Sequence, residues 1–121
     1  MVNTGLLAQE HDIIVQQGAT FQKTLIVKDT ADQPIDLTGY TARMQVRADY
    51  EATQPALDLT TENSGIAIDG PAGEITLTAA DTDTSALSIT NGFYDLELIK
   101  PSGDVVRLLQ GKVAVSREVT R

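Results

Sequence analysis

Polar and apolar residues alternate between positions 40 and 48, and this pattern limits the fold more than any other feature of the chain. The even positions carry tyrosine or aliphatic side chains, and the odd positions carry polar or charged ones. Alternation with period two is typical of a β-strand with one buried face, because successive side chains point to opposite sides of a sheet. The turn-forming sequence DLTG directly precedes this segment and prevents a helix from extending into it. Arg43 and Arg47 therefore belong to the outward face of the expected strand.

Short segments of the same kind follow one another along the chain, separated by Asp, Asn, Gly and Pro residues that favour turns. Strands are expected at 11–17, 20–29, 40–48, 57–60, 66–69, 75–78, 94–99 and 106–115. The one helical signal is a single turn within 79–92, with Thr82 or Asp83 as its N-cap. About eight short strands with turn signals between them predict an all-β fold. The expected architecture is a single antiparallel β-sandwich, Ig-like or jelly-roll-like.

The last strand contains a change of parity. Its apolar residues begin at even positions, with Val106 and Leu108, and end at odd positions, with Val113 and Val115. A change of this kind needs one extra residue in the strand, which is the definition of a β-bulge. Because glycine is frequent at bulges, we predict the bulge at Gln110-Gly111.

The length of 121 residues and the hydrophobic fraction of 41% fit one domain with a core of its own. We assign residues 1–10 to an N-terminal arm and residues 11–121 to the sandwich domain. The chain begins without a charged region followed by an apolar one, so we expect no signal peptide and synthesis in a cytoplasm. No apolar run approaches the roughly 20 residues that a membrane-spanning helix needs, so no membrane partner is expected.

The composition argues against several classes of partner and cofactor. Nine Lys and Arg stand against 17 Asp and Glu, for a net charge of −8, whereas a nucleic-acid binder needs a basic footprint. The chain has no cysteine, so disulfides and thiolate metal sites are excluded. It also lacks the glycine-rich motifs that hold phosphates. We therefore expect no nucleic-acid partner, no metal and no cofactor.

Few residues are candidates for catalysis. His11 is the only histidine and is expected at the surface, and no nucleophile-elbow motif accompanies it. A small hydrolase would need a cleft that unites His11 with acidic residues. Asp95 and Glu97 share one face of a strand, roughly 7 Å apart, which is a separation that glycosidases use. The simpler interpretation is a solvated face opposite Arg107 on the neighbouring strand, so we expect no enzyme.

The sequence DTDTS places Asp81, Asp83 and Ser85 at alternating positions. Such spacing is compatible with oxygen ligands for calcium. The glycine and the distant bidentate glutamate of an EF-hand loop are missing, and helix capping by Asp and Thr is the alternative. The sequence leaves calcium binding at Asp81 and Asp83 open.

Several segments, in their order, resemble small proteins encoded by tailed bacteriophages. They are GATFQKTLIVKDTADQ, then PIDLTGYTARMQVR, then YDLELIKPSGDVVRLLQGKVAVSREVTR. The set is similar to the N-terminal β-sandwich domain of phage baseplate upper proteins, and it covers about residues 12–121. In that family a longer receptor-facing portion follows the domain. This chain ends directly after the closing strand, so the resemblance implies the attachment module alone.

The resemblance implies a non-enzymatic structural component of the virion, made in the bacterial host cytoplasm. It would be a docking or adaptor module of the tail, baseplate or fibre-attachment region, whose partners are other phage structural proteins and further copies of itself. A capsid decoration or collar protein of the same virion is an alternative. A carbohydrate or host-surface binding module is a second alternative, which needs exposed tyrosines around a shallow groove. Parity places Tyr40 and Tyr94 inward, so Tyr50 is the one tyrosine left as a candidate for an exposed binding position.

Six residues are candidates for the interface of such a module. Arginine is favoured at interfaces because its planar guanidinium binds carboxylates through two hydrogen bonds. Arg43 and Arg47 are therefore candidates to pair with acidic groups of a neighbour, and Asp95 and Glu97 offer complementary groups for self-association. The alternative is a solvated face on which the arginines pair locally. The adjacent apolar residues of the arm, Leu6 and Leu7, form a second candidate contact.

Overall fold

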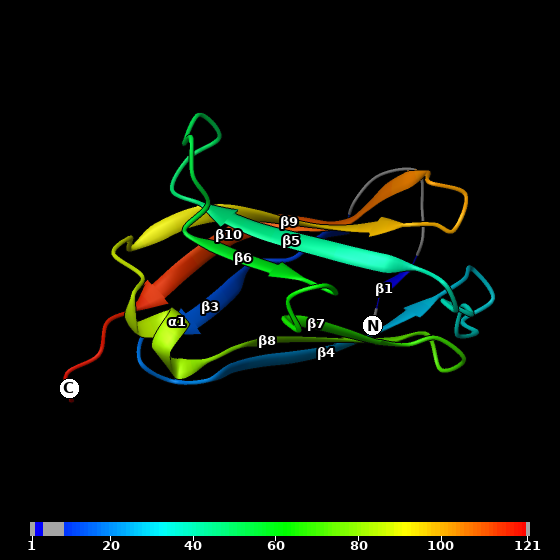
Figure 1. The fold of residues 1–121 in the computed structure, drawn as a ribbon, viewed down its shortest axis with the longest axis horizontal. Helices are drawn as coiled ribbons and strands as arrows, with labels where there is room; N and C mark the ends of the chain where they lie inside the picture. Colours follow the sequence, from blue (N-terminus) through cyan, green and yellow to red (C-terminus); the bar gives the residue numbers. More distant parts are fainter. Residues whose placement is uncertain (1, 4–8, 121) are drawn as a thin grey trace.

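The computed structural model describes residues 2–3 and 9–120, which form two β-sheets packed face to face (Figure 1). The four-stranded sheet has the order β1 (Val2–Asn3), β4 (Phe21–Lys28), β8 (Glu74–Ala79), β7 (Ile66–Asp69). The six-stranded sheet has the order β2 (Gln9–Glu10), β10 (Val105–Ser116), β9 (Asn91–Ile99), β5 (Thr41–Arg47), β6 (Leu57–Thr60), and β3 (Ile13–Gln16) also pairs with β10. The predicted all-β sandwich is confirmed.

The N-terminal segments enter the sandwich through parallel pairings. All eight expected strands form, and the expected arm contributes two further strands of two residues each, β1 and β2. β1 lies parallel to β4, and both β2 and β3 lie parallel to β10, whereas the remaining strand pairs are antiparallel. Leu6 and Leu7 lie outside the described residues.

The core lies between the sheets and is built from the inward side of each alternation. In β5 the even residues Ala42, Met44 and Val46 are each 1% exposed, as their parity predicts. They face a matching set in the other sheet that includes Ile75 and Leu77. Burial of such side chains is the main force that holds the two sheets together.

The two tyrosines that parity places inward are in the interior. Tyr94 is 5% exposed, and Tyr40 is half-buried and packs against the core. The hydroxyl of Tyr94 donates a hydrogen bond to the main-chain carbonyl of His11. Tyr94 therefore ties the segment between β2 and β3 to the centre of the six-stranded sheet.

The β-bulge lies in β10, but its predicted position is wrong. Arg107 pairs with Glu97 and Leu109 pairs with Leu96, so Leu108 is the extra residue. Leu108 and Leu109 are 3% and 2% exposed, which means that two successive residues face the core. The parity changes between these two leucines, two residues before the predicted Gln110-Gly111.

Position 111 is occupied by glycine for a reason unrelated to the bulge. A Cβ atom at this position would lie 2.8 Å from the carbonyl carbon of His11 and 2.9 Å from Oδ1 of Asp12. The chain between β2 and β3 runs alongside β10 at this point, where His11 N donates to Gln110 O at 2.9 Å and Lys112 N donates to Asp12 Oδ1 at 2.9 Å. Glycine therefore permits a close approach of two backbones.

The predicted helical turn forms as α1 (Asp81–Ser85), but neither Thr82 nor Asp83 is its N-cap. The N-cap is Ala80, and no side chain caps the helix there. Because the helix starts two residues earlier than a cap at Thr82 allows, both candidates lie inside it. The buried Thr84 fixes the turn instead, since its hydroxyl donates to Ala19 O at 2.8 Å and accepts from Gly18 N at 3.1 Å.

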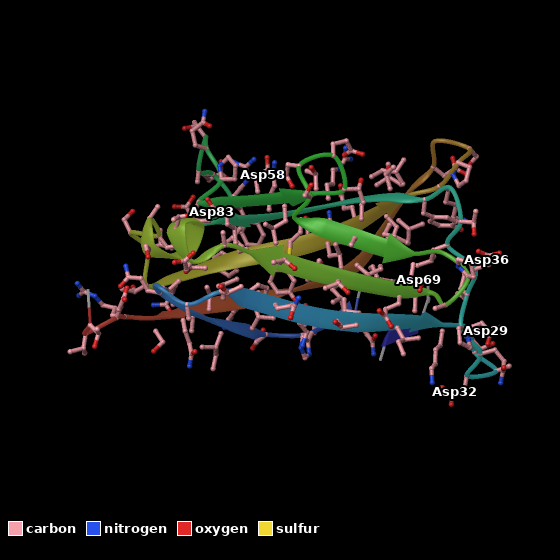
Figure 2. All side chains as sticks on the ribbon, turned by 60° about the horizontal axis from the view of Figure 1, so that its bottom comes forward. Asp29, Asp32, Asp36, Asp58, Asp69 and Asp83 are labelled. Atoms are coloured by element: carbon pink, nitrogen blue, oxygen red, sulfur yellow. The ribbon has the colours of Figure 1, made fainter. Side chains whose placement is uncertain are left out.

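Part of the acidity lies at one end of the sandwich, where Figure 2 places the loop residues Asp29, Asp32 and Asp36 and the last residue of β7, Asp69. Asp29 accepts hydrogen bonds from the main-chain N–H groups of residues 31 and 33. Asp36 accepts from the hydroxyl and the N–H of Thr38, and these two bonds lower the pKa of Asp36. Two of these carboxylates therefore hold turns, as Asp side chains commonly do.

Candidate binding surface on the six-stranded sheet

The outward face of β5, β9 and β10 carries three of the chain's five arginines. These strands lie side by side, so their outward residues form rows across the sheet. The rows are Arg43–Glu97–Arg107, Gln45–Asp95–Gln110 and Arg47–Phe93–Lys112. Parity alone placed Arg43, Arg47, Asp95 and Glu97 on the outer face, and the structure brings all four together there.

Two ion pairs order this face. Arg43 Nε lies 2.8 Å from Glu97 Oε1, and Arg107 Nε lies 3.5 Å from Asp95 Oδ2. The expected partnership with Arg107 is therefore right for Asp95, whereas Glu97 pairs with Arg43. Because the two arginine side chains are about half exposed, each pair contributes only about 0–1 kcal/mol to stability. Their main effect is to hold long side chains in fixed orientations.

Arg47 joins the face to the loop between β5 and β6. Its guanidinium donates to Ala52 O at 2.7 Å and to Gln45 Oε1 at 2.8 Å. In the described part of the chain, no carboxylate forms an ion pair with Arg47. The loop stands out from the sandwich on the side away from the four-stranded sheet (Figure 1). Arg47 thus anchors the base of the projecting β5–β6 loop.

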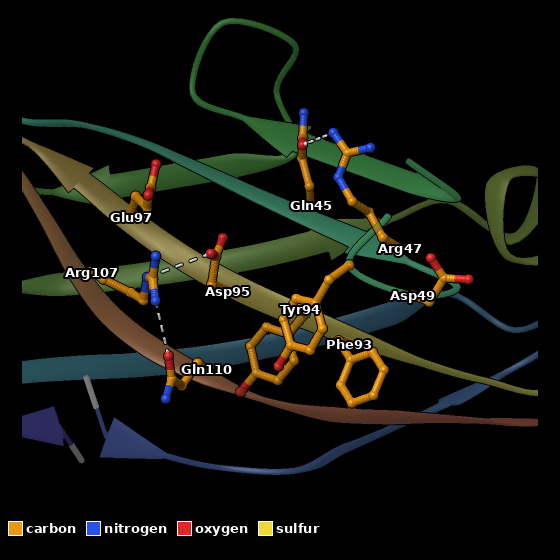
Figure 3. A pocket seen from close by; sticks show the side chains of 10 residues that line it. Gln45, Arg47, Asp49, Phe93, Tyr94, Asp95, Glu97, Arg107 and Gln110 are labelled. Atoms are coloured by element: carbon orange, nitrogen blue, oxygen red, sulfur yellow. Dashed lines mark hydrogen bonds and ion pairs between the residues drawn. The ribbon is translucent and has the colours of Figure 1, made fainter. Parts of the chain in front are cut away.

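An open groove of about 470 Å³ lies between this loop and the sheet (Figure 3). Tyr50, from the loop, stacks on Phe93 of β9 with ring centroids 4.7 Å apart and an interplanar angle of 20°. Tyr50 is nevertheless 80% exposed. The groove is lined by Gln45, Arg47, Asp49, Tyr50, Phe93, Tyr94, Asp95, Glu97, Arg107 and Gln110. It therefore combines an exposed aromatic ring with polar side chains.

Asp95, on the floor of the groove, is incompletely neutralised. Its partial burial raises its pKa, and the neighbouring charge of Glu97 raises it further. Arg107, Arg43 and Arg47 act in the opposite direction, but the net shift of the pKa is upward. The ionised carboxylate therefore gains from any further hydrogen-bond donor that reaches it.

The other candidate residues lie away from this face. Asp81 and Asp83 are in the first turn of α1, and His11 is exposed beside β10. Among residues 2–3 and 9–120, no group of three or more His, Asp or Glu side chains is arranged to hold a metal ion. Within the same residues, no helix has the length and apolar character needed to cross a membrane.

The pairing of Tyr50 with Phe93 was not predicted from sequence. Phe93 shares the odd parity of Asp95 and Glu97, and this signal was sufficient to place its ring on the outward face. Tyr50 lies beyond the end of β5, where parity no longer applies. Its position depends on the path of the β5–β6 loop, which only the folded chain defines.

The burial of the Tyr94 hydroxyl makes the stability of the fold depend on pH in the alkaline range. Burial, followed by the charges of Asp12 and Glu10, raises the pKa of Tyr94 to about 12. Because the folded pKa lies above the unfolded value of about 10, the neutral phenol stabilises the fold below pH 10. This contribution, of up to about 2 kcal/mol, is lost as the pH rises from about 10 to 12.

Replacing Tyr94 with phenylalanine is expected to lower the free energy of unfolding by about 1 kcal/mol at neutral pH, because the His11 carbonyl loses its donor. Urea unfolding at several pH values measures this change. The Tyr94→Phe protein should also lose less stability between about pH 10 and pH 12 than the wild type. Tyr50→Phe, at an exposed ring, is the matched control and should follow the wild type. Equal alkaline losses in Tyr94→Phe and the wild type would contradict this account.

No known protein family matches the chain, and no curated protein sequence matches it either. The resemblance to phage baseplate proteins was inferred from sequence motifs and stays a prediction.

Proposed function

We propose that this chain is a non-enzymatic structural protein of a tailed-bacteriophage virion, and that it acts as a docking or adaptor module of the tail, baseplate or fibre-attachment region. The ordered motifs that resemble the baseplate domain support this proposal. Two of the quoted segments supply β5, β9 and β10, the three adjacent strands whose outward residues form the charged face. The strands of the charged face thus lie largely within segments that carry the resemblance.

The observation that carries the proposal is a patch at the β9–β10 hairpin end of this face. Ile99 and Val105 lie opposite each other across the hairpin, and Val105 is 49% exposed. The row of Arg43, Glu97 and Arg107, in which Arg43 pairs with Glu97, lies directly beside them. We call these five residues the docking patch. Apolar residues bordered by oriented arginines are typical of protein–protein interfaces.

The chemistry of the docking patch indicates its partner. The guanidinium groups of Arg43 and Arg107 are held by single carboxylates and keep further N–H donors for a second protein. A partner that presents carboxylates to these donors and an apolar side chain to Val105 is complementary to the patch. We infer that this partner is another structural protein of the virion or a further copy of this chain.

Incorporation into phage particles tests the proposal. The double variant Arg43→Glu, Val105→Asp reverses one charge and places another on the apolar part of the docking patch. We expect its amount in purified particles to fall about tenfold or more, which corresponds to a loss of about 1.4 kcal/mol of binding free energy. Quantitative immunoblotting of gradient-purified particles measures the amount.

Lys100→Glu is the matched control, because it makes a comparable change of charge at an exposed position of the β9–β10 loop outside the patch. It should be incorporated as the wild type is. Thermal unfolding of each variant separates misfolding from lost docking. Incorporation of the folded double variant at the wild-type level would overturn the role of the patch.

A further inference from the structure

We propose that the groove beside Tyr50 is a binding site for a neutral saccharide. In this site the exposed ring of Tyr50 is the stacking platform, and Gln45 and Asp95 on the floor are the hydrogen-bonding groups. The inference goes beyond docking and does not depend on it. The groove lies beside the β5–β6 loop, whereas the docking patch centres on the β9–β10 hairpin, and the two share Glu97 and Arg107. Figure 1 shows this loop and this hairpin at opposite ends of the sandwich.

The first argument is the aromatic platform. A pyranose ring presents a face of C–H groups that packs on an aromatic ring, and tyrosine suits this contact because its body is apolar and its tip polar. Phe93 supports the ring of Tyr50 at 4.7 Å, and Arg47 fixes the loop through Ala52 O. The platform is therefore ordered before any ligand arrives, which lowers the entropic cost of binding.

The second argument is the orientation of the polar floor. Gln45 Oε1 is occupied by Arg47, so the amide Nε2 of Gln45 remains as a donor (Figure 3). Asp95 is bound only through Oδ2, by Arg107, and its Oδ1 makes no hydrogen bond to any described residue. Gln45 and Asp95 lie directly opposite each other in the pairing of β5 with β9. A donor and an acceptor so placed match adjacent hydroxyl groups of a sugar.

The third argument concerns the class of ligand. β5, β9 and β10 each have strands on both sides, so their main-chain groups are already paired. A peptide therefore cannot bind here by adding a strand, and recognition must come from side chains. The volume of about 470 Å³ falls within the usual range for small-ligand sites.

The charges favour a neutral ligand over an acidic one. Arg47 and Arg107 line the groove together with Asp49, Asp95 and Glu97, which leaves an excess of one negative charge. The whole chain carries a net charge of −8, which repels phosphates and acidic sugars. A hydroxyl group, in contrast, donates to the incompletely neutralised Asp95 without adding a negative charge.

Titration of the full chain by two-dimensional NMR tests the proposal. The probes are three neutral trisaccharides, maltotriose, cellotriose and triacetylchitotriose, and the acidic trigalacturonate, each up to about 10 mM so that millimolar affinity is detected. We expect at least one neutral probe to shift the amide signals of Tyr50 and Phe93 and the side-chain amide of Gln45. Trigalacturonate should bind at least about tenfold more weakly than that probe.

Substitutions then locate the site. Tyr50→Ala should weaken binding of the neutral probe about tenfold or more, whereas Tyr50→Phe retains the stacking ring and most of the affinity. Val105→Asp, in the docking patch, should leave affinity unchanged. The proposal is overturned if no neutral probe shifts the groove signals, if trigalacturonate binds as tightly, or if Tyr50→Ala binds as the wild type does.

A protein ligand in the groove gives a different result. Tyr50→Ala would then reduce incorporation into particles, and no saccharide would bind, which would assign the groove to the docking interface and overturn the saccharide site. Saccharide binding with wild-type incorporation of Tyr50→Ala is the expected combination. The two proposals therefore fail independently.

Discussion

Replacing Leu96 with alanine is expected to lower the free energy of unfolding by about 2–5 kcal/mol, the largest effect of any single change considered for this protein. Leu96 is fully buried on the inward face of β9, and its cross-strand neighbours, Met44 and Leu109, are also buried. Removing three carbon atoms there leaves a cavity. The paired strands β5 and β10, one on each side of β9, prevent the cavity from closing.

Urea unfolding followed by circular dichroism measures this loss. Ile14→Ala is the matched control, because Ile14 is an aliphatic residue of the same sheet that is 68% exposed. It should change stability by no more than about 0.5 kcal/mol. A loss below about 1 kcal/mol for Leu96→Ala would contradict the packing described for the six-stranded sheet.

Replacing Gly111 with alanine is expected to cost roughly 2–4 kcal/mol, although it adds only one carbon atom. The new Cβ would overlap the backbone of His11, and backbone cannot rotate away as a flexible side chain can. Moving the segment aside breaks the hydrogen bonds that join His11 and Asp12 to β10. Amide hydrogen exchange should therefore accelerate in β3 as well as near residue 111.

Gly103→Ala separates this clash from ordinary glycine effects. Gly103 has φ +94°, which disfavours alanine, but a Cβ there meets no atom within 4 Å. Its cost should be about 1 kcal/mol, from conformation alone. If Gly111→Ala proved no more destabilising than Gly103→Ala, the close approach of the His11 backbone to β10 would be wrong.

The strands were predictable because each sheet has one buried face. In β5 and β9, buried residues alternate strictly with more exposed ones, as the alternation in the sequence predicts. β1 and β2 were not predicted, since a two-residue strand has no periodicity and depends on partners far away in the sequence.

The errors of position arose where local pattern is ambiguous. The parity change in β10 requires one extra residue but does not say which, and glycine at 111 suggested the wrong place. Only the burial of both Leu108 and Leu109 locates the bulge. Similarly, DTDTS contains several residues able to cap a helix, and the contacts of Thr84 with residues 18 and 19 decide the outcome.

The candidate surface shows the same division between local and long-range information. Outward parity predicted the charged face, because each of its members lies within a regular strand. The groove was not predictable, since it needs a loop residue, Tyr50, to reach a ring on a strand more than 40 positions later. The charged face, which consists of strand residues, was thus predictable from sequence. The groove, which needs a contact between a loop residue and a distant strand, was not.

The most direct test of the central claim is to purify tailed particles from cultures that carry this coding sequence and to count the copies of the protein in each particle. Quantitative mass spectrometry against a major structural protein of the same particles gives this number. Our account predicts a fixed number of copies that sediments with the particles and persists through density gradients. Recovery of the protein only in the free fraction, with none in intact particles, would contradict a structural role in the virion.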